Sequence, residues 1–342
     1  MTNSLEKFLS DIFKFKKTIN ENDDTDITSI LTQNFIELND VLNKCPSIIK
    51  YVNYISDSNL IDEILSQENF FSQNYFTYLD SSISEIPDSI QDIETFYKDN
   101  KDDSYFKIKE IYNYFSSNDV PLAIKNNYNY NFSFKEDYSK GIYYKTCSVC
   151  QQQIATGNRD LDHFLNKKYF PLLCLKKDNL VPMCRICNIC YKKTRLPKIP
   201  VIHPSKVEFP ISNIKFKLIN LSSLVINKEI LTEDYINYIE LMDLERRISH
   251  EDILSTIEEL IKNIKDQTKE IVTPGMRLYE IITILKSKIT HLIVFFQSNP
   301  NLVPQSHIKI QILENLLDNV LSQYKIAIMI YHSIVHESLL EQ

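Results

Sequence analysis

Two Cys-x-x-Cys pairs constrain this chain more than any other feature of its sequence. Cys147 and Cys150 form the first pair, Cys184 and Cys187 form the second, and 33 residues separate the pairs. Cysteine thiolates at this spacing are typical zinc ligands, and a closed set of four sulfurs leaves no open position on the ion. We therefore predict a structural rather than a catalytic zinc site, which ties the two ends of residues 147–187 together.

The remaining cysteines leave one ambiguity in the ligand set. Cys190 extends the second pair to Cys-x-x-Cys-x-x-Cys, so it competes with Cys184 as a ligand. An odd total of seven cysteines, clustered in pairs, indicates metal binding in a reducing compartment rather than a disulfide framework. Four unrelated buried cysteines are the alternative interpretation.

A second group of residues lies between and beside the cysteine pairs. Asp162 and His163 are adjacent, Asn179 opens an Asn-Leu-Val-Pro run, and Asn188 follows the last cysteine of the second pair. A neutral histidine can accept a proton from water, and a carboxylate can hold a divalent cation. Neighbouring strand residues face opposite sides, so Asp162 and His163 can share a site only where a strand ends or bulges. A histidine packed in a zinc-ribbon fold is the alternative.

Charge distinguishes the same part of the chain. Residues 141–200 hold eleven basic and three acidic residues, a net charge of +8, whereas the whole chain carries −7 and its flanks therefore −15. A basic centre between acidic flanks is expected of a phosphate-binding site, although a solvated surface gives the same pattern. The predicted phosphate contacts are Arg159, Arg185, Lys192 and Lys193.

This ordered set of motifs resembles the HNH endonucleases of the ββα-metal, or His-Me finger, type that carry a four-cysteine zinc site. The likeness covers roughly residues 143–195 and is carried by the runs LDHFLNKKYFPLL and DNLVPMCRICN. It implies two strands and a helix, with a strand ending near Asp162 and His163 and the helix starting near Cys184.

The resemblance also implies a role for each motif residue. His163 corresponds to the general base that deprotonates water, and Asn179 to the residue that braces the loop and orients that base. Asp162 and Asn188 correspond to ligands of a catalytic Mg²⁺ or Mn²⁺, and their oxygens suit a hard cation. Many members of the family have a metal-binding histidine at the position of Asn188.

The implied activity is metal-dependent hydrolysis of phosphodiester bonds in nucleic acid, with double-stranded DNA as the expected substrate and anti-phage defence or restriction as the expected setting. Asn166 stands where the family commonly has proline, and Tyr191 stands where it usually has a phosphate-binding lysine. Two alternatives remain: a zinc-ribbon adaptor that binds nucleic acid without turnover, and a nuclease subunit activated by a partner protein such as an ATPase.

The chain as a whole is predicted to be mostly α, with helical N- and C-terminal regions around a small central zinc-bound ββα-metal module. Residues 1–140 form a helical region of unknown role, with apolar residues at helical spacing from Ser4 and again from Thr28 to Leu42. The HNH module occupies 141–200, a proline-rich connector 201–231, and a helical bundle 232–342. Only three glycines occur, which argues against glycine-rich phosphate-binding loops.

Capping signals predict the helix boundaries of the C-terminal region. The expected features are Thr232 as the cap of a helix through Leu244, a capping box of Ser249 and Asp252, a helix from Thr273–Pro274 to Ser298, and a last helix from about Ser306 to Leu340. The apolar stripes of these helices can pack within the chain or support an oligomer. His203 lies beside a proline and is expected to be polar surface rather than a site residue.

Hydropathy predicts a soluble, cytoplasmic protein with no membrane partner. The longest apolar candidate, residues 281–296, is interrupted by two lysines and a histidine, and a membrane span needs about 18 apolar residues. The first residues contain acids and a lysine where a signal peptide requires an apolar core.

Overall fold

A computed structural model of the chain describes residues 4–21, 26–44, 58–81, 86–99, 122–128, 146–154, 159–170, 173, 176–207, 210–300 and 303–340. The chain divides into two compact units, each assembled from three segments. Unit 1 comprises residues 1–144, 161–182 and 194–205, and unit 2 comprises 145–160, 183–193 and 206–342. The stretch predicted as one central module is thus divided between the units, and the fold is mostly helical as predicted.

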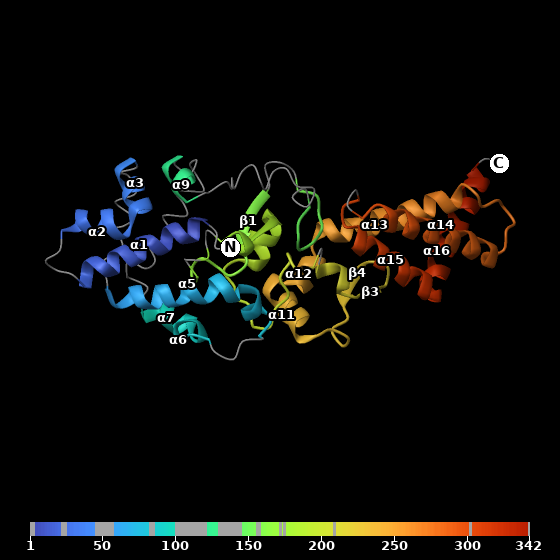
Figure 1. The fold of residues 1–342 in the computed structure, drawn as a ribbon. Helices are drawn as coiled ribbons and strands as arrows, with labels where there is room; N and C mark the ends of the chain where they lie inside the picture. Colours follow the sequence, from blue (N-terminus) through green and yellow to red (C-terminus); the bar gives the residue numbers. More distant parts are fainter. Residues whose placement is uncertain are drawn as a thin grey trace. The chain divides into compact units, whose positions relative to one another are not determined.

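The described part of unit 1 consists mainly of helices. In chain order they are α1 (Ser4–Glu21), α2 (Ile27–Asn34), α3 (Ile36–Lys44), α5 (Ser58–Leu79), α6 (Asp88–Gln91), α7 (Ile93–Asp99) and α9 (Leu122–Asn127). Helix α1 forms where its apolar spacing predicts, buries Phe8, Ile12 and Phe13, and packs against α5 (Figure 1). The predicted single helix from Thr28 to Leu42 is wrong, because Phe35 leaves helical geometry and separates α2 from α3.

Aromatic side chains form part of the core of unit 1. Phe71 and Tyr75 of α5 are buried, and the ring of Phe71 packs edge to face against Phe170 at 5.6 Å between centroids. Edge-to-face pairs stabilise beyond the area that they bury. Phe170 belongs to the segment that follows the Asp-His dipeptide, so this ring pair packs that segment against α5.

Two short strands carry the predicted motifs. Strand β1 (Arg159–His163) pairs with β2 (Leu180–Cys184), and the 3-10 turn η5 (Lys177–Asn179) directly precedes β2. Strand β1 ends at His163, where a strand end was expected. The predicted helix begins two residues after Cys184, as η6 (Ile186–Lys192), and it is a π-helix, in which Lys193 N–H donates to the Asn188 carbonyl at 2.8 Å.

A β-hairpin in unit 2 was not predicted. Strands β3 (Phe216–Ile219) and β4 (Ser223–Ile226) pair antiparallel, with Phe216 opposite Ile226, inside the stretch interpreted as a connector. Phe216, Leu218, Leu224 and Ile226 are buried while the residues between them are more exposed, the alternation of a half-buried strand. The 3-10 turn η7 (Pro210–Asn213) precedes the hairpin, and helix α15 packs against β3.

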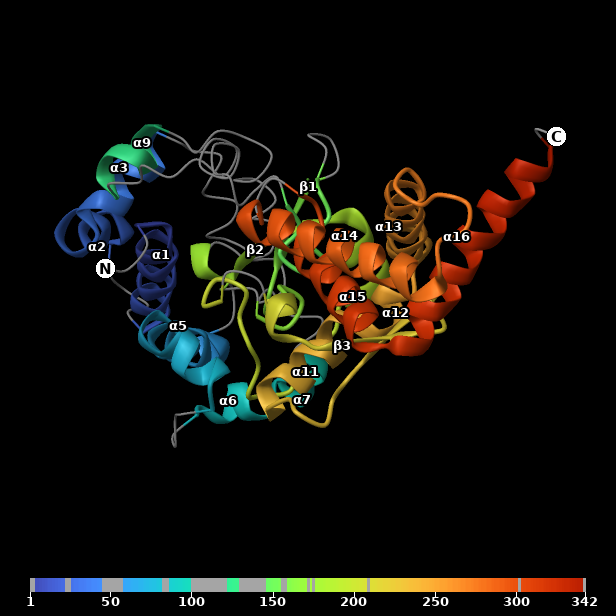
Figure 2. The same ribbon diagram turned by 90° about the vertical axis from the view of Figure 1, so that its right-hand side faces the viewer.

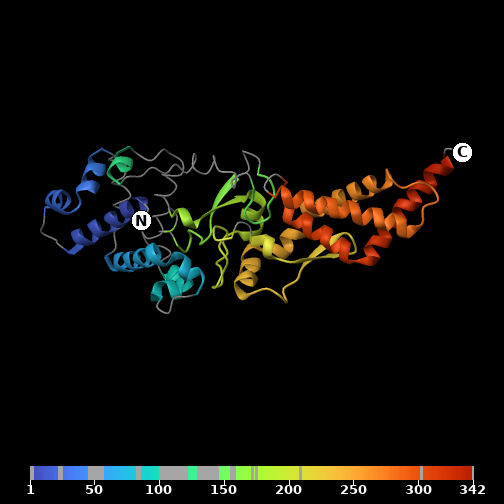
Figure 3. The same cartoon turned by 45° about the vertical axis from the view of Figure 1, so that its right-hand side comes forward.

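The C-terminal part of unit 2 is a helical bundle, as predicted. Its helices are α11 (Glu233–Met242), α12 (Leu244–Ile248), α13 (Glu251–Lys269), α14 (Leu278–Ser298), α15 (Ser306–Asp318) and α16 (Val320–Leu340). Helix α14 packs against α13, α15 and α16, and the orange and red ribbons of Figures 2 and 3 show these four helices together. Their apolar stripes bury residues such as Ile257, Leu285 and Leu313.

Two predicted boundaries at α11 and α13 shift by one or two residues. Thr232 does precede α11, but Asp243 adopts a left-handed conformation (φ 49°) and ends the helix at Met242. At α13 the N-cap is His250 rather than Ser249, because the Nδ1 atom of His250 accepts the Asp252 N–H at 3.4 Å. An imidazole acceptor here replaces the hydroxyl that the sequence suggested.

The two predicted long helices differ more. Helix α14 ends at Ser298 as expected but begins at Leu278, because Gly275 takes a positive φ of 96° in a turn after Thr273–Pro274. The predicted last helix is two helices, since Asn319 is extended (φ −103°, ψ 96°) and separates α15 from α16. Helix α16 leaves apolar side chains such as Leu321 and Ile328 exposed. Among the described helices, none is both long and apolar enough to cross a membrane.

Candidate metal centre and predicted catalytic residues

Four buried cysteines of unit 2 lie together and could hold a metal ion such as zinc. Cys147 and Cys150 are fully buried, Cys184 and Cys187 nearly so, and their sulfur atoms all lie within 4.8 Å of one another. The Cys150 and Cys184 sulfurs are 3.9 Å apart. A tetrahedron with Zn–S bonds of about 2.3 Å has edges of about 3.8 Å, so the donor set and its spacing fit zinc.

Local structure explains how each cysteine pair is presented. In the first pair, residues 147–152 form a tight turn: Gln151 N–H donates to the Cys147 carbonyl and Cys147 N–H to the Gln152 carbonyl, both at 2.9 Å. In the second pair, Cys184 is the last residue of β2 and Cys187 lies in η6, so Cys184 precedes the helix that was expected to start near it. The Cys187 N–H donates to the Cys184 sulfur at 3.4 Å, so the two cysteines of this pair are in direct contact.

The structure decides between Cys184 and Cys190. Cys184 belongs to the buried cluster, whereas Cys190 is exposed. Cys45 and Cys174 lie outside the described residues. The predicted set of Cys147, Cys150, Cys184 and Cys187 is therefore the one that the fold brings together.

The pKa values of the four thiols shift in different directions. Burial raises the pKa of the Cys147 thiol well above its usual value, and hydrogen bonding among the sulfurs raises the pKa of Cys187. Interactions with the neighbouring sulfurs, first with that of Cys147, lower the pKa of the Cys184 thiol. Ligating sulfurs must be thiolates, so a bound divalent cation supplies the charge that lets all four ionise.

A buried arginine contacts this cluster, and sequence reasoning missed it. Arg247 of α12 is fully buried; its Nε–H donates to the Cys187 sulfur at 3.3 Å and an Nη2–H to the Cys150 sulfur at 3.2 Å. Its two terminal nitrogens, Nη1 and Nη2, also donate to the two oxygens of the Asp252 carboxylate at 2.6 and 2.8 Å. Burial opposes the charge on Arg247, but Cys150 and Asp252 outweigh burial and raise its pKa. In the sequence its one signal is a charge between the apolar residues Leu244 and Ile248.

The predicted base and its neighbour lie at the end of β1. His163 is buried, 4% exposed, and is the last residue of the strand. Asp162 is half-buried and its Oδ2 atom is shielded from solvent. Alternate residues of a strand share a face, so Asp160 and Asp162 lie on one face of β1. His163 is the last residue of the strand, so the alternation of faces need not hold for its side chain.

Asn179 makes four side-chain hydrogen bonds within unit 1. It is fully buried, its Oδ1 accepts from the Leu165 N–H at 2.7 Å and the Tyr75 hydroxyl at 2.9 Å, and its Nδ2 donates to the carbonyls of Leu165 and Leu173 at 3.0 and 3.1 Å. Its backbone carbonyl accepts the Phe164 N–H at 2.7 Å. One side chain thus fixes the backbone that follows the Asp-His dipeptide.

The predicted catalytic residues are divided between the units. His163, Asp162 and Asn179 belong to unit 1, whereas Asn188 belongs to unit 2. In unit 2 the Asn188 Nδ2 atom donates to Asp160 Oδ2 at 3.2 Å. Sequence reasoning had given Asp160 no role, yet it is the acid that Asn188 contacts.

The four predicted phosphate-binding residues are not equally accessible. Arg185 and Lys193 are exposed, Lys192 is fully buried, and the side chain of Arg159 is not among those described. A buried lysine cannot meet a phosphate at the surface, so Arg185 and Lys193 are the better candidates.

His203 is buried, not the surface residue expected from its place beside a proline. Its ring lies 4.4 Å from that of Phe164 between centroids and also packs against Tyr75. Its Nδ1 atom lies 2.7 Å from the Ser205 hydroxyl and accepts the Ser205 N–H at 3.1 Å. His203 therefore belongs to the core of unit 1, beneath the residue that follows His163.

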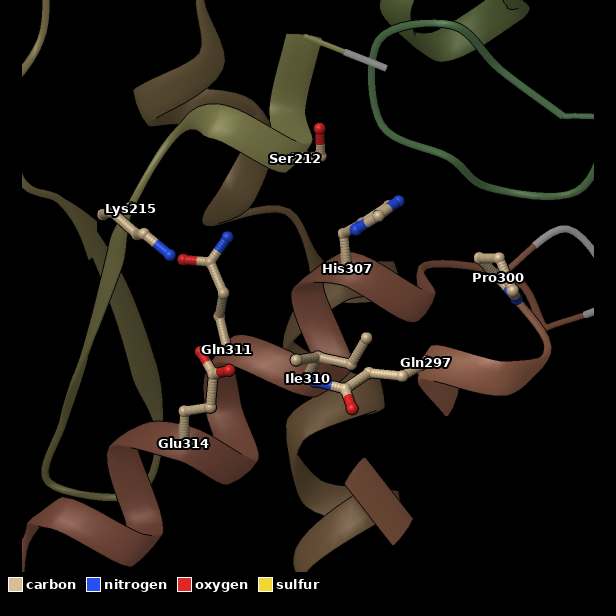
Figure 4. A pocket seen from close by; sticks show the side chains of 8 residues that line it. All are labelled: Ser212, Lys215, Gln297, Pro300, His307, Ile310, Gln311 and Glu314. Carbon is tan, nitrogen blue, oxygen red and sulfur yellow. The ribbon is translucent and has the colours of Figure 1, made fainter. Parts of the chain in front are cut away.

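Unit 2 also contains a pocket of about 300 Å³ (Figure 4). Lys215, which precedes β3, points toward Gln311 of α15, and Glu314 lies beside them. The Gln311 amide is already engaged, donating to the Ile214 carbonyl at 2.8 Å and accepting the Phe216 N–H at 2.8 Å. None of the lining residues that the structure describes belongs to the predicted catalytic or metal-binding set.

Comparison of the chain with models of known protein families, with curated proteins and with solved structures finds no match.

Proposed function

We propose that this chain is a metal-dependent endonuclease of the HNH type that hydrolyses phosphodiester bonds in nucleic acid, with double-stranded DNA as its substrate. The proposal begins from the ordered motifs of the sequence: Asp162 with His163, then Asn179, then Asn188 after the second cysteine pair. Anti-phage defence or restriction is the biological setting that the resemblance suggests.

The observation that supports this function most is the hydrogen bonding of Asn179. A bracing residue must hold the chain that follows the base, and Asn179 contacts Phe164 through its backbone and Leu165 through its side chain. A buried asparagine that makes four hydrogen bonds restricts the movement of the loop, and catalysis requires reacting groups to be held in fixed positions. An asparagine kept only for a surface turn needs no such network.

Each predicted residue then has one task in hydrolysis. His163 accepts the proton of the attacking water, whose oxygen forms the new bond to phosphorus as the bond to the leaving oxygen breaks. Asp162 and Asn188 offer a carboxylate and an amide oxygen, a donor set suited to Mg²⁺ or Mn²⁺, and Asp160 is the neighbouring acid that Asn188 contacts. Such a cation, when bound, polarises the phosphate and stabilises the leaving oxygen.

Zinc has a separate, structural task in this proposal. Cys147, Cys150, Cys184 and Cys187 fill a tetrahedron, so the zinc has no open position for substrate. It joins the turn at residues 147–152 to the end of β2 and the start of η6, the segment that carries Asn188. Arg185 and Lys193, exposed at either end of η6, contact phosphates and position the substrate.

Cleavage assays on purified protein test the proposal. Supercoiled plasmid, linear duplex DNA and RNA are each incubated with the protein in Mg²⁺, in Mn²⁺ and in EDTA, with and without cell extract that can supply a partner. We expect nicking or linearisation of plasmid in Mg²⁺ or Mn²⁺ and none in EDTA.

The same assay assigns the alternatives. Binding of DNA without cleavage in any metal, with or without extract, would replace the nuclease by a zinc-ribbon adaptor. Cleavage only with extract would indicate a nuclease subunit that a partner such as an ATPase activates. Cleavage of RNA but not DNA would keep the chemistry and change the substrate.

A further inference from the structure

Arg247 occupies an unusual position for a charged side chain. It is among the largest fully buried side chains of the described chain, and burying an unpaired charge is costly. The hydrogen-bond partners of its guanidinium therefore indicate the role of this side chain.

Those partners include two of the four candidate zinc ligands. The Nε–H points at the Cys187 sulfur and Nη2 at the Cys150 sulfur, at 3.3 and 3.2 Å, ordinary distances for hydrogen bonds to sulfur. One sulfur comes from each Cys-x-x-Cys pair, so a single planar group bridges the two halves of the cluster. Nη2 also lies 3.3 Å from the Gln152 side-chain oxygen, within the turn of the first pair.

The guanidinium is held in place from its other side. Asp252, near the start of α13, accepts from Nη1 and Nη2 in a bidentate pair, and His250 in turn lies 2.7 Å from an Asp252 oxygen. The ring of Tyr191 in η6 lies 5.9 Å from the centre of the guanidinium. Bidentate pairing fixes both the position and the plane of the group, which a lysine ammonium cannot do.

We propose that Arg247 is a positioning residue of the zinc centre, which orients Cys150 and Cys187 by hydrogen bonds to their sulfur atoms. The inference rests on the proposed zinc site and adds a dependence on α12 and α13, since Arg247 of α12 lies 60 residues beyond Cys187 and 97 beyond Cys150 in the sequence. Four thiolates around one Zn²⁺ carry excess negative charge, and hydrogen bonds from a fixed cation disperse it. The same bonds lower the nucleophilicity of the two sulfurs.

A simpler explanation is that Arg247 and Asp252 form a buried ion pair and that the sulfur contacts are incidental. The two explanations differ in what they predict. A structural ion pair affects only the free energy of unfolding. Hydrogen bonds to ligating sulfurs also affect the zinc affinity and the energy of the sulfur-to-metal charge-transfer band. The test must therefore measure the metal centre as well as the stability.

The experiment compares Arg247→Met with the matched control Arg246→Met in the full chain. Arg246 is the adjacent arginine, and its side chain is 68% exposed and bonded to Asp243 rather than to sulfur. Zinc affinity is measured by competition with a chelator, and the cobalt-substituted protein gives the sulfur-to-metal charge-transfer band. We expect Arg247→Met to weaken zinc binding about 10- to 100-fold and to shift the band to lower energy, with Arg246→Met like the wild type.

The outcomes separate the two proposals. A wild-type protein that holds no zinc overturns the zinc site, and the role of Arg247 with it. A wild-type protein that holds zinc, with an Arg247→Met variant that matches it in affinity and charge-transfer energy, overturns the role of Arg247 alone. If Arg247→Met does not fold, Asp252→Asn decides by the same two measurements, because it frees the guanidinium without touching a sulfur; unchanged values there likewise overturn the proposal.

Discussion

Among single substitutions in unit 1 that leave every cysteine in place, we expect Asn179→Ala to be one of the most destabilising. The asparagine is fully buried and makes four side-chain hydrogen bonds, to the Leu165 N–H, the Leu165 carbonyl, the Leu173 carbonyl and the Tyr75 hydroxyl. Alanine removes all four. The Leu165 N–H, the Leu165 carbonyl and the Tyr75 hydroxyl then lose this partner, whereas the Leu173 carbonyl still accepts the Lys176 N–H at 3.2 Å.

The size of the effect follows from that count. A net hydrogen bond contributes about 0.5–1.5 kcal/mol, and a buried group left without a partner costs about 1–3 kcal/mol. Some relaxation is expected, because backbone groups at the loop can tilt toward one another or toward water. We therefore expect Asn179→Ala to lower the free energy of unfolding by about 3–5 kcal/mol.

A graded series provides the control. Tyr75→Phe removes one of the four bonds and no ring packing, and should cost about 1 kcal/mol. Urea denaturation followed by circular dichroism gives both values, and an unchanged slope shows that the same surface unfolds. In the double variant, Tyr75→Phe should cost less than it does alone, because its partner is already gone. If Asn179→Ala costs no more than Tyr75→Phe, Asn179 does not brace the loop.

Three further predictions concern the metal ligands, the basic surface and the response to pH. Cys190→Ser should retain one zinc per chain by elemental analysis while Cys184→Ser loses it, and the reverse would move the ligand to Cys190. Replacing Arg185 and Lys193 by glutamine should weaken DNA binding and flatten its dependence on salt by about one unit of slope per lost contact, with no change in slope if they do not meet phosphate. Burial raises the pKa of Tyr78 from 10.0 to about 12, so the neutral ring stabilises the fold fully below pH 10 and this contribution is lost as the pH rises toward 12. The free energy of unfolding of Tyr78→Phe should therefore fall less steeply between pH 10 and 12 than that of the wild type. Identical dependence of the two free energies on pH would refute the raised pKa of Tyr78.

Sequence patterns predicted the features that depend on neighbours along the chain. The apolar spacing from Ser4 gave α1, and the C-terminal stripes gave a helical bundle, because helix periodicity is a local property. The paired cysteines gave the members of the buried cluster for the same reason: each pair is presented by a short local turn.

The errors arose where a contact far away in the sequence or a single backbone torsion decides. Asn319 interrupts a continuous apolar stripe. His250 rather than Ser249 caps α13, and the turn at Gly275 delays the start of the helix predicted from Thr273. Hydrogen bonds from Gln311 of α15 support the hairpin at β3, and a proline-rich sequence gave no sign of them.

The functional residues show the same division. Asn179 is identifiable from its motif, but its four hydrogen bonds go to three residues, and one of these, Tyr75 of α5, lies 104 residues away in the sequence. Arg247 could not be found from spacing, because its sulfur partners lie 60 and 97 residues away. Lys192 appears in the sequence as one of two adjacent surface lysines, yet the fold buries it and exposes Lys193.

The most direct test of the proposed chemistry is the rate of plasmid cleavage by His163→Ala relative to the wild type, at equal zinc content and equal DNA affinity. The change removes the proton acceptor for water, a contribution of about 10²- to 10⁴-fold, and removes neither a predicted zinc ligand nor a predicted phosphate contact. The nuclease proposal predicts a loss of that size with one zinc per chain still bound. A His163→Ala protein that cuts at the wild-type rate would contradict it.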